Sequence, residues 1–129
     1  MKIVLEPIGV IRSPIADPAD APRQGSESVV RGKLVVDEKY KDAFLGLERG
    51  RKIEILYWMH LADRNVFQVH PRHDVTRPMR GVFTTRSPER PNPISIGTVE
   101  VVGIEGTIIE VEGLDAVDGT PLLDIKCVA

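Results

Sequence analysis

Short runs of apolar and β-branched residues recur along the whole chain, and each run is bounded by Gly, Pro, Asp or Ser. Such runs are typical of β-strands, and turn residues at close intervals favour an antiparallel arrangement. The pattern predicts a mainly β protein with six to eight strands that form an antiparallel barrel. The expected strands are residues 4–11, 29–36, 52–60, 66–69, 79–84, 96–104, 107–114 and 122–125.

One segment departs from the strand pattern. Asp37 is a suitable N-cap, and the apolar residues that follow it recur at helical spacing, so residues 37–47 are expected to form one short amphipathic helix. Residues 16–28 are rich in Pro, Asp, Gly and Ser and are expected to form an exposed loop. Between the two strands near the C-terminus, Gly106 can adopt the positive φ that a hairpin turn needs.

Composition narrows the class of protein. The chain has 129 residues, which fits one domain spanning residues 1–129, and its 42% hydrophobic and 28% charged residues are typical of a soluble globular protein. A formal charge of −2 gives no global attraction to nucleic acid. A local basic segment exists, however, because residues 72–90 contain five arginines against Asp74 and Glu89.

The single cysteine, Cys127, cannot form an internal disulfide and suits a reducing compartment. The N-terminal sequence has Glu6, Pro7 and Gly9 where a signal peptide would need an apolar core, and no stretch is long enough to span a bilayer. We therefore expect a cytoplasmic protein.

Two polar segments, residues 81–98 and residues 115–126, stand out as candidate sites. Residues 81–98 place three prolines beside arginine, asparagine and hydroxyl side chains, so the backbone can hold polar groups in fixed directions. Taken alone, Arg86 and Arg90 also fit solvated loop charges, Asn92 fits a residue that bonds its own backbone, and residues 118–121 fit an ordinary turn.

Five sequence blocks, in the same order, resemble the TsaA-like family, whose bacterial members include the tRNA threonylcarbamoyladenosine N6-methyltransferases (TrmO). The blocks are PIGVIRSP at residues 7–14, PRQ at 22–24, the apolar strand that ends at His60, RSPERPNPI at 86–94 and DAVDGTPLLDIK at 115–126. The resemblance is to a short form without the family's C-terminal domain. It implies a small single-sheet β-barrel, S-adenosylmethionine (SAM) as cofactor and a homodimer.

The resemblance also implies a function and its residues. The reaction is methyl transfer to the N6 nitrogen of threonylcarbamoyladenosine beside the tRNA anticodon. Asp118 or His60 is the candidate base, and Arg86 is suited to the carboxylate of SAM. Asp115 or Asp118 is suited to the ribose hydroxyls or the ammonium of SAM. The implied SAM contacts are Pro22, Arg23, Gln24, His60, Leu61, Arg86, Ile96, Val117, Asp118, Gly119 and Thr120, and the candidate RNA contacts are Arg72, Arg77, Arg80, Arg90 and Asn92.

Other classes of site are weakly supported by the residues. The chain has no G-x-G-x-x-G motif and no nucleophile elbow. His70 and His73 lack an acidic or cysteine partner at metal-ligand spacing, so no metal site is expected. Two alternatives to a transferase remain open: a module that binds SAM or another small ligand without turnover, and an adaptor that docks an acidic partner through residues 72–90.

Overall fold

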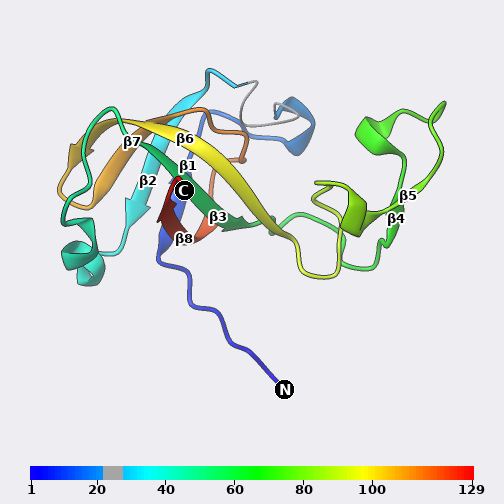
Figure 1. Cartoon of the computed structure of the whole chain (residues 1–129), viewed down its shortest axis with the longest axis horizontal. Coiled ribbons are helices and arrows are strands. Elements are labelled where there is room, and N and C mark those ends of the chain that lie inside the picture. The colour runs from blue at the N-terminus through cyan, green and yellow to red at the C-terminus, as the bar shows by residue number, and fades with distance from the viewer. Residues whose placement is uncertain (22–27) are drawn as a thin grey trace.

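The computed structural model describes residues 1–21 and 28–129, and six of its strands close into an antiparallel barrel (Figure 1). Around the barrel the strand order is β1, β2, β7, β6, β3, β8. The predicted antiparallel barrel is therefore confirmed. The barrel strands are β1 Gly9–Arg12, β2 Arg31–Val36, β3 Lys52–Trp58, β6 Ile94–Glu105, β7 Ile108–Glu112 and β8 Thr120–Cys127.

The connection between β3 and β6, residues 59–93, projects sideways from the barrel, and we call it the arm (Figure 1). It contains its own two-stranded sheet, formed by β4 (Gln68–Val69) and β5 (Arg80–Gly81). The strand predicted for residues 79–84 is shorter than expected, because Val82–Thr84 form the 3-10 turn η5. The arm is thus a separate small sheet beside the barrel.

The predicted helix is present as the 3-10 helix η3, Glu38–Phe44. Its N-cap is Asp37, whose side chain accepts a hydrogen bond of 3.0 Å from the amide of Lys39. Tyr40, Phe44 and Leu47 pack against the barrel core, as the helical spacing requires. Two further 3-10 turns are η1 (Pro18–Asp20) and η4 (Pro71–His73). No helix among the described residues has the length and apolar character needed to cross a bilayer.

The first predicted strand begins later than the apolar pattern suggested. Residues 1–7 extend away from the barrel, and pairing starts where the amide of Ile8 donates to the carbonyl of Leu122 (Figure 1). Ile3 and Val4 are 74% and 82% exposed. A β-type sequence alone did not make a strand here. β2 ends at Val36, opposite Gly9, so residues 1–7 have no strand beside them on that side, and Pro7 has no amide N–H to donate to β8, which continues past Leu122.

The core fills the inside of the barrel with the inward side chains of alternating strand positions. In β3, Ile53, Ile55 and Tyr57 point inward, and Tyr57 is only 1% exposed. The hairpin between β6 and β7 turns at Gly106 with a φ of 60°, as the sequence predicted. Other buried core residues, one or more from every barrel strand, include Ile11, Leu34, Val99, Val101, Ile109, Val111 and Leu122.

Antiparallel order gives the barrel two distinct ends. The β1–β2, β3–β6 and β7–β8 connections all leave from the end where β3 finishes and β6 begins, and we call this the loop end. Helix η3, the β6–β7 hairpin and the last residues of β8 lie at the opposite end, which we call the helix end. Segments that are distant in sequence are therefore brought together at the loop end.

Candidate functional site

The loop end carries all of the predicted cofactor residues that the structure describes. His60 and Leu61 follow β3, and Arg86 lies in the arm just before β6. Ile96 is the third residue of β6, and the turn that contains Asp118 leads into β8. Pro22, Arg23 and Gln24 lie outside the described residues. The topology thus brings described candidates from the β3–β6 and β7–β8 connections, and from β6 itself, to one end of the barrel.

A small cavity opens beside Arg86. The Arg86 side chain is exposed and its Nη2 lies 3.4 Å from the carbonyl oxygen of Ile96, which ties the arm to the start of β6. The cavity volume is about 70 Å³, which is room for a small polar group and far less than a complete nucleoside needs. Its lining residues are Thr85, Arg86, Ser87, Pro88, Arg90, Ile94, Ser95 and Ile96.

Arg90 organises the loop that presents Arg86. Its Nε donates to the carbonyl of Ser87 at 2.7 Å, and its Nη2 donates to the carbonyls of Val82 and Thr85 at 2.5 and 2.7 Å. A guanidinium suits this task because its donors point in fixed, divergent directions. Arg90 thus makes three hydrogen bonds to backbone oxygens. This residue, which was predicted to contact RNA, therefore has a structural role in the loop.

Asn92 is held by a residue that the sequence analysis did not single out. Arg64 donates from Nη2 to Asn92 Oδ1 at 3.0 Å and from Nε to the carbonyl of Pro91 at 2.7 Å. The same guanidinium lies over the ring of Trp58, 5.2 Å from its centroid. Arg64 therefore joins the end of β3 to the Pro-rich loop, and no short motif around it signals this contact.

Inside the loop end lies a polar pair that the sequence analysis only half identified. The buried hydroxyl of Tyr57 donates to Oδ1 of Asp115, which lies in the β7–β8 connection. Burial raises the pKa of Tyr57, and the charge of Asp115 raises it further. Burial also raises the pKa of Asp115, although the Tyr57 hydrogen bond and the charge of Arg86 oppose this. Asp115 was predicted as a candidate contact of SAM. Tyr57 was not predicted, because it lies in an apolar strand whose residues are expected to form the core.

The turn before β8 is fixed to the end of β1. Asp118 Oδ1 accepts from the amide of Ser13 at 3.1 Å, and Oδ2 lies 3.6 Å from Arg12 Nη1. Gly119 has a φ of 84°, a conformation that favours glycine. Thr120 is 1% exposed and its hydroxyl donates to the carbonyl of Val117 at 2.7 Å. Every predicted cofactor residue of this turn thus also has a structural role.

The remaining predicted RNA contacts lie on the exposed surface of the arm. Arg72, Arg77 and Arg80 are all exposed, and Arg72 has a positive φ of 54°. Arg77 Nε lies 3.4 Å from Asp74 Oδ2, and hydrogen bonds from Thr76 lower the pKa of Asp74. Among the described residues, no group of three or more His, Cys, Asp or Glu side chains gathers as a metal site would require.

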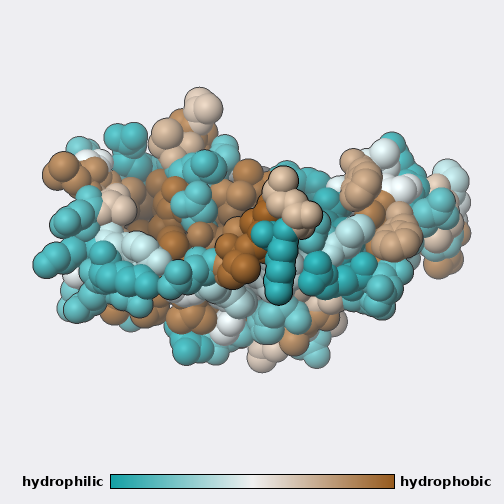
Figure 2. Space-filling view, turned by 90° about the horizontal axis from the view of Figure 1, so that it is seen from below, coloured by the Kyte–Doolittle hydropathy of each residue, from teal (hydrophilic) through white to brown (hydrophobic). Residues whose placement is uncertain are grey.

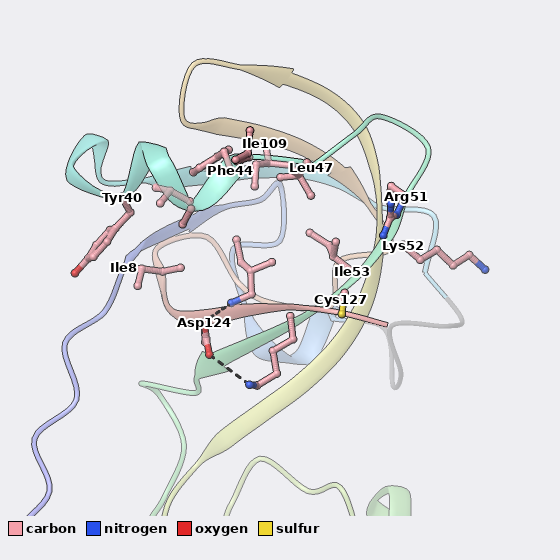
Figure 3. Close-up of a pocket in the computed structure, with 16 residues that line it drawn as sticks. Ile8, Tyr40, Phe44, Leu47, Arg51, Lys52, Ile53, Ile109, Asp124 and Cys127 are labelled. Carbon is pink, nitrogen blue, oxygen red and sulfur yellow. Dashed lines mark hydrogen bonds and ion pairs between the residues drawn. The ribbon is translucent and has the colours of Figure 1, made fainter. Parts of the chain in front are cut away.

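A larger cavity, of about 380 Å³, lies at the helix end of the barrel, beside η3 (Figure 3). Its size suits a small ligand, but its charge is the wrong sign for a sulfonium cation such as SAM. Arg51, Lys52 and Lys126 line it with a single carboxylate, Asp124, which is 3.9 Å from Lys126. The candidate SAM site is therefore the loop end and not this cavity.

Comparison with known proteins places the chain in a family. Residues 10–129 match the family described as the tRNA-methyltransferase O N-terminal domain. The chain belongs to this family. The match extends from β1 to the last residue, so it includes every described element of the barrel and the arm.

Similar proteins come from archaea and bacteria. A probable S-adenosyl-L-methionine-binding protein of Methanothermobacter thermautotrophicus is 48% identical over 126 residues, which is 98% of this chain and 90% of the relative. An S-adenosyl-L-methionine-binding protein of Archaeoglobus fulgidus is 44% identical over 124 residues, with 96% and 88% covered. The crystal structure of TrmO from Pseudomonas aeruginosa matches with a TM-score of 0.80 at 32% identity, covering all of this chain but only 57% of TrmO.

Proposed function

We propose that this chain is a SAM-dependent methyltransferase whose cofactor binds at the loop end of the barrel. The observation that carries the proposal is the match of residues 10–129 to the tRNA-methyltransferase O N-terminal family. The names of the archaeal relatives support the same cofactor, since they are described as binding S-adenosyl-L-methionine.

The residues at the loop end fit the chemistry of SAM. Arg86 offers a guanidinium for its carboxylate, and Asp115 offers an acceptor for its ammonium or ribose hydroxyls. Leu61 and Ile96 are 61% and 42% exposed and offer apolar contacts for its adenine. The cavity of about 70 Å³ beside Arg86 takes only part of the cofactor, so the rest lies over the surrounding open surface.

Bound SAM supplies an electrophilic methyl group, and the chain supplies position. Alignment of two reactants can lower the activation barrier by roughly 7–11 kcal/mol, so a strong catalytic acid or base is not required. The base that we propose is His60, which is exposed and follows the end of β3. Asp118 is already engaged by Ser13 and Arg12, and we assign it to holding the turn before β8.

The acceptor that we propose is the N6 nitrogen of threonylcarbamoyladenosine beside the tRNA anticodon. The likeness to solved TrmO structures supports it, and the exposed Arg72, Arg77 and Arg80 on the arm offer charge for RNA phosphates. The chain spans 55–58% of the length of those structures, so the activity of the whole protein is part of this proposal. A tRNA substrate would place the enzyme in the cytoplasm.

We propose that the chain forms a homodimer through the apolar surface of the arm. Five large apolar side chains are exposed there, and Figure 2 shows apolar patches over both the barrel and the arm on one face. Such clustering is typical of an interface, and a second copy would also cover the shallow SAM site. The five residues are Leu61, Phe67, Val75, Met79 and Phe83.

The dimer can be tested by light scattering after size-exclusion chromatography. Phe83 is 85% exposed on the arm, and Leu45 is 96% exposed at the helix end, so the two make a matched pair. We expect Phe83→Asp to convert the dimer to a monomer and Leu45→Asp to leave it intact. A wild-type monomer at micromolar concentration, or a dimer in both variants, would refute this interface.

The function can be tested in two steps. Calorimetric titration with SAM, with ATP as the control nucleotide, should show one saturable site selective for SAM. Purified protein should then transfer a labelled methyl group to tRNA that carries threonylcarbamoyladenosine and not to the same tRNA without that modification. Absence of SAM binding at millimolar concentration would refute the proposal.

A second candidate is a SAM-binding module without transferase activity. The chain covers 90% and 88% of two relatives described only as SAM-binding proteins, but little more than half of the TrmO structures. SAM binding without methyl transfer to modified tRNA would favour this candidate. Binding of an acidic partner with indifference to SAM would instead favour an adaptor.

A further inference from the structure

The loop end contains one polar pair that reaches from the barrel interior to the candidate site. Tyr57 is the last inward residue of β3 and is 1% exposed, while the Asp115 that accepts its hydrogen bond is partly exposed. A buried phenol needs a partner for its hydroxyl, yet water or a backbone carbonyl would satisfy that need at less cost than a carboxylate. The choice of a carboxylate therefore calls for a functional explanation.

Local backbone geometry directs the hydroxyl toward Asp115. The pairing of β3 with β8 shifts register between Leu56 and Tyr57, which is the kind of irregularity that re-aims a side chain beside an active site. On the other side, Gly97 of β6 lies beside the phenol, since an added Cβ would make an ordinary van der Waals contact of 3.7 Å with Tyr57 Oη. The phenol therefore lies beside Gly97 of β6, and its hydroxyl reaches Asp115 at the loop end.

Arg86 gives this pair its complementary charge. It is close enough to lower the pKa of Asp115, and the cavity beside it is lined by Ser95, the cross-strand neighbour of Tyr57. Arg86 and Asp115 are not joined by any of the ion pairs within the described part of the chain. Arg86 and Asp115 therefore offer a cation and an anion that are not paired with each other. Such an arrangement is complementary to a ligand that carries both a negative and a positive charge.

We propose that Asp115 and Arg86 together recognise the zwitterionic amino-acid end of the cofactor, and that Tyr57 is a positioning residue that aims the Asp115 carboxylate at the ammonium group. This inference rests on the proposed SAM function. Arg86 takes the carboxylate, and the small cavity of about 70 Å³ suits this end of the molecule better than its nucleoside. We assign the ammonium to Asp115 in preference to Asp118, because Asp118 Oδ1 already accepts from the amide of Ser13 and Oδ2 lies 3.6 Å from Arg12 Nη1.

The test uses three adenosine thioethers, so that the sulfonium charge does not contribute. They are S-adenosylhomocysteine, its analogue that keeps the carboxylate but lacks the α-amino group, and methylthioadenosine, which lacks the whole amino-acid end. Calorimetry on the wild-type protein should show that loss of the amino group weakens binding about 10- to 100-fold, as expected for a hydrogen bond between charged groups. Equal affinities for the first two compounds would overturn the inference without any variant.

Variants then assign the discrimination to residues. Asp115→Asn should bring the ratio between the first two compounds to within about threefold, and Tyr57→Phe should lower it about 3- to 10-fold. Tyr57→Phe in the Asp115→Asn background should have no further effect on the ratio. Methylthioadenosine should bind all variants within about twofold of wild type, which shows that the site is intact. Tyr40→Phe, at the helix end, is the matched control and should change nothing.

Each other outcome has a definite meaning. If Asp115→Asn abolishes the discrimination and Tyr57→Phe does not alter it, the positioning role of Tyr57 is wrong. If neither variant alters it, another group recognises the ammonium and the inference is wrong. If the wild-type protein binds none of the three thioethers and no SAM, the proposed function itself fails and this inference falls with it.

Discussion

Replacing Arg90 by alanine removes one guanidinium that three backbone carbonyls share. Its donors reach Ser87, Val82 and Thr85 at 2.5–2.7 Å, and these residues flank Arg86 in the Pro-rich loop. The substitution therefore distinguishes two roles for Arg90. An RNA contact would affect only RNA binding, whereas a loop organiser would affect stability and the presentation of Arg86.

The size of the effect can be worked out bond by bond. The carbonyl of Val82 keeps two other donors, the amide and hydroxyl of Thr85, both at 3.1 Å, so the loss there is small. The carbonyls of Ser87 and Thr85 lose a charge-assisted partner, at about 1 kcal/mol each for partly buried groups. We expect Arg90→Ala to lower the free energy of unfolding by about 2–3 kcal/mol and Tm by about 5–12 °C.

Calorimetric unfolding and SAM titration measure both consequences. Because the loop carries Arg86, we expect the Kd for SAM to rise about tenfold as well. Arg77→Ala is the matched control, since Arg77 is exposed and makes one surface pair of 3.4 Å with Asp74, worth less than about 1 kcal/mol. An Arg90→Ala variant with wild-type Tm and wild-type SAM affinity, but weaker tRNA binding, would refute the organising role.

Three further predictions concern separate parts of the site. Arg86→Ala should abolish detectable SAM binding in a titration while Tm stays within about 2 °C, because the side chain is exposed; unchanged affinity would remove Arg86 from the site. The double variant Arg77→Ala and Arg80→Ala should raise the KM for tRNA and leave SAM affinity unchanged, as measured by methyl-transfer kinetics, and the reverse pattern would assign these arginines to the cofactor. Burial raises the pKa of Asp115, so its contribution to stability is present below the ordinary pKa of aspartate and is lost as pH rises through the folded-state value. Urea unfolding between pH 4 and 7 should accordingly show Asp115→Asn gaining stability relative to wild type as pH rises, and a growing deficit would contradict this.

The fold was predictable because its signals are local. Alternation in residues 52–58 gives β3 and its inward side chains directly, and Gly106 marks the β6–β7 turn. The capping of η3 by Asp37 is equally local. The start of β1 was not predictable, because it depends on where β2 ends: Val36 lies opposite Gly9, so the apolar residues before Ile8 have no strand beside them on that side. Strand boundaries of this kind are set by partners and not by propensity.

The candidate site was predictable only as a set of segments. Family blocks placed Arg86 and the turn before β8 in one site, and the barrel topology brings both to the loop end. The contacts that fix them join residues far apart in the sequence, such as Asp118 with Ser13, 105 positions away, and Tyr57 with Asp115, 58 positions away. No period or short motif encodes such a pair, since each partner looks ordinary in its own segment.

The two ends of the barrel divide stability from chemistry. At the helix end, Tyr40, Phe44 and Leu47 pack on the core, and turns there are tight. At the loop end, a carboxylate with a raised pKa, a nearby cation and exposed apolar side chains are all retained at a cost to the isolated fold. Features that destabilise a chain on its own persist where a ligand or partner compensates for them. Both the cofactor and a second copy of the chain are therefore expected at the loop end, and both should raise Tm when they bind.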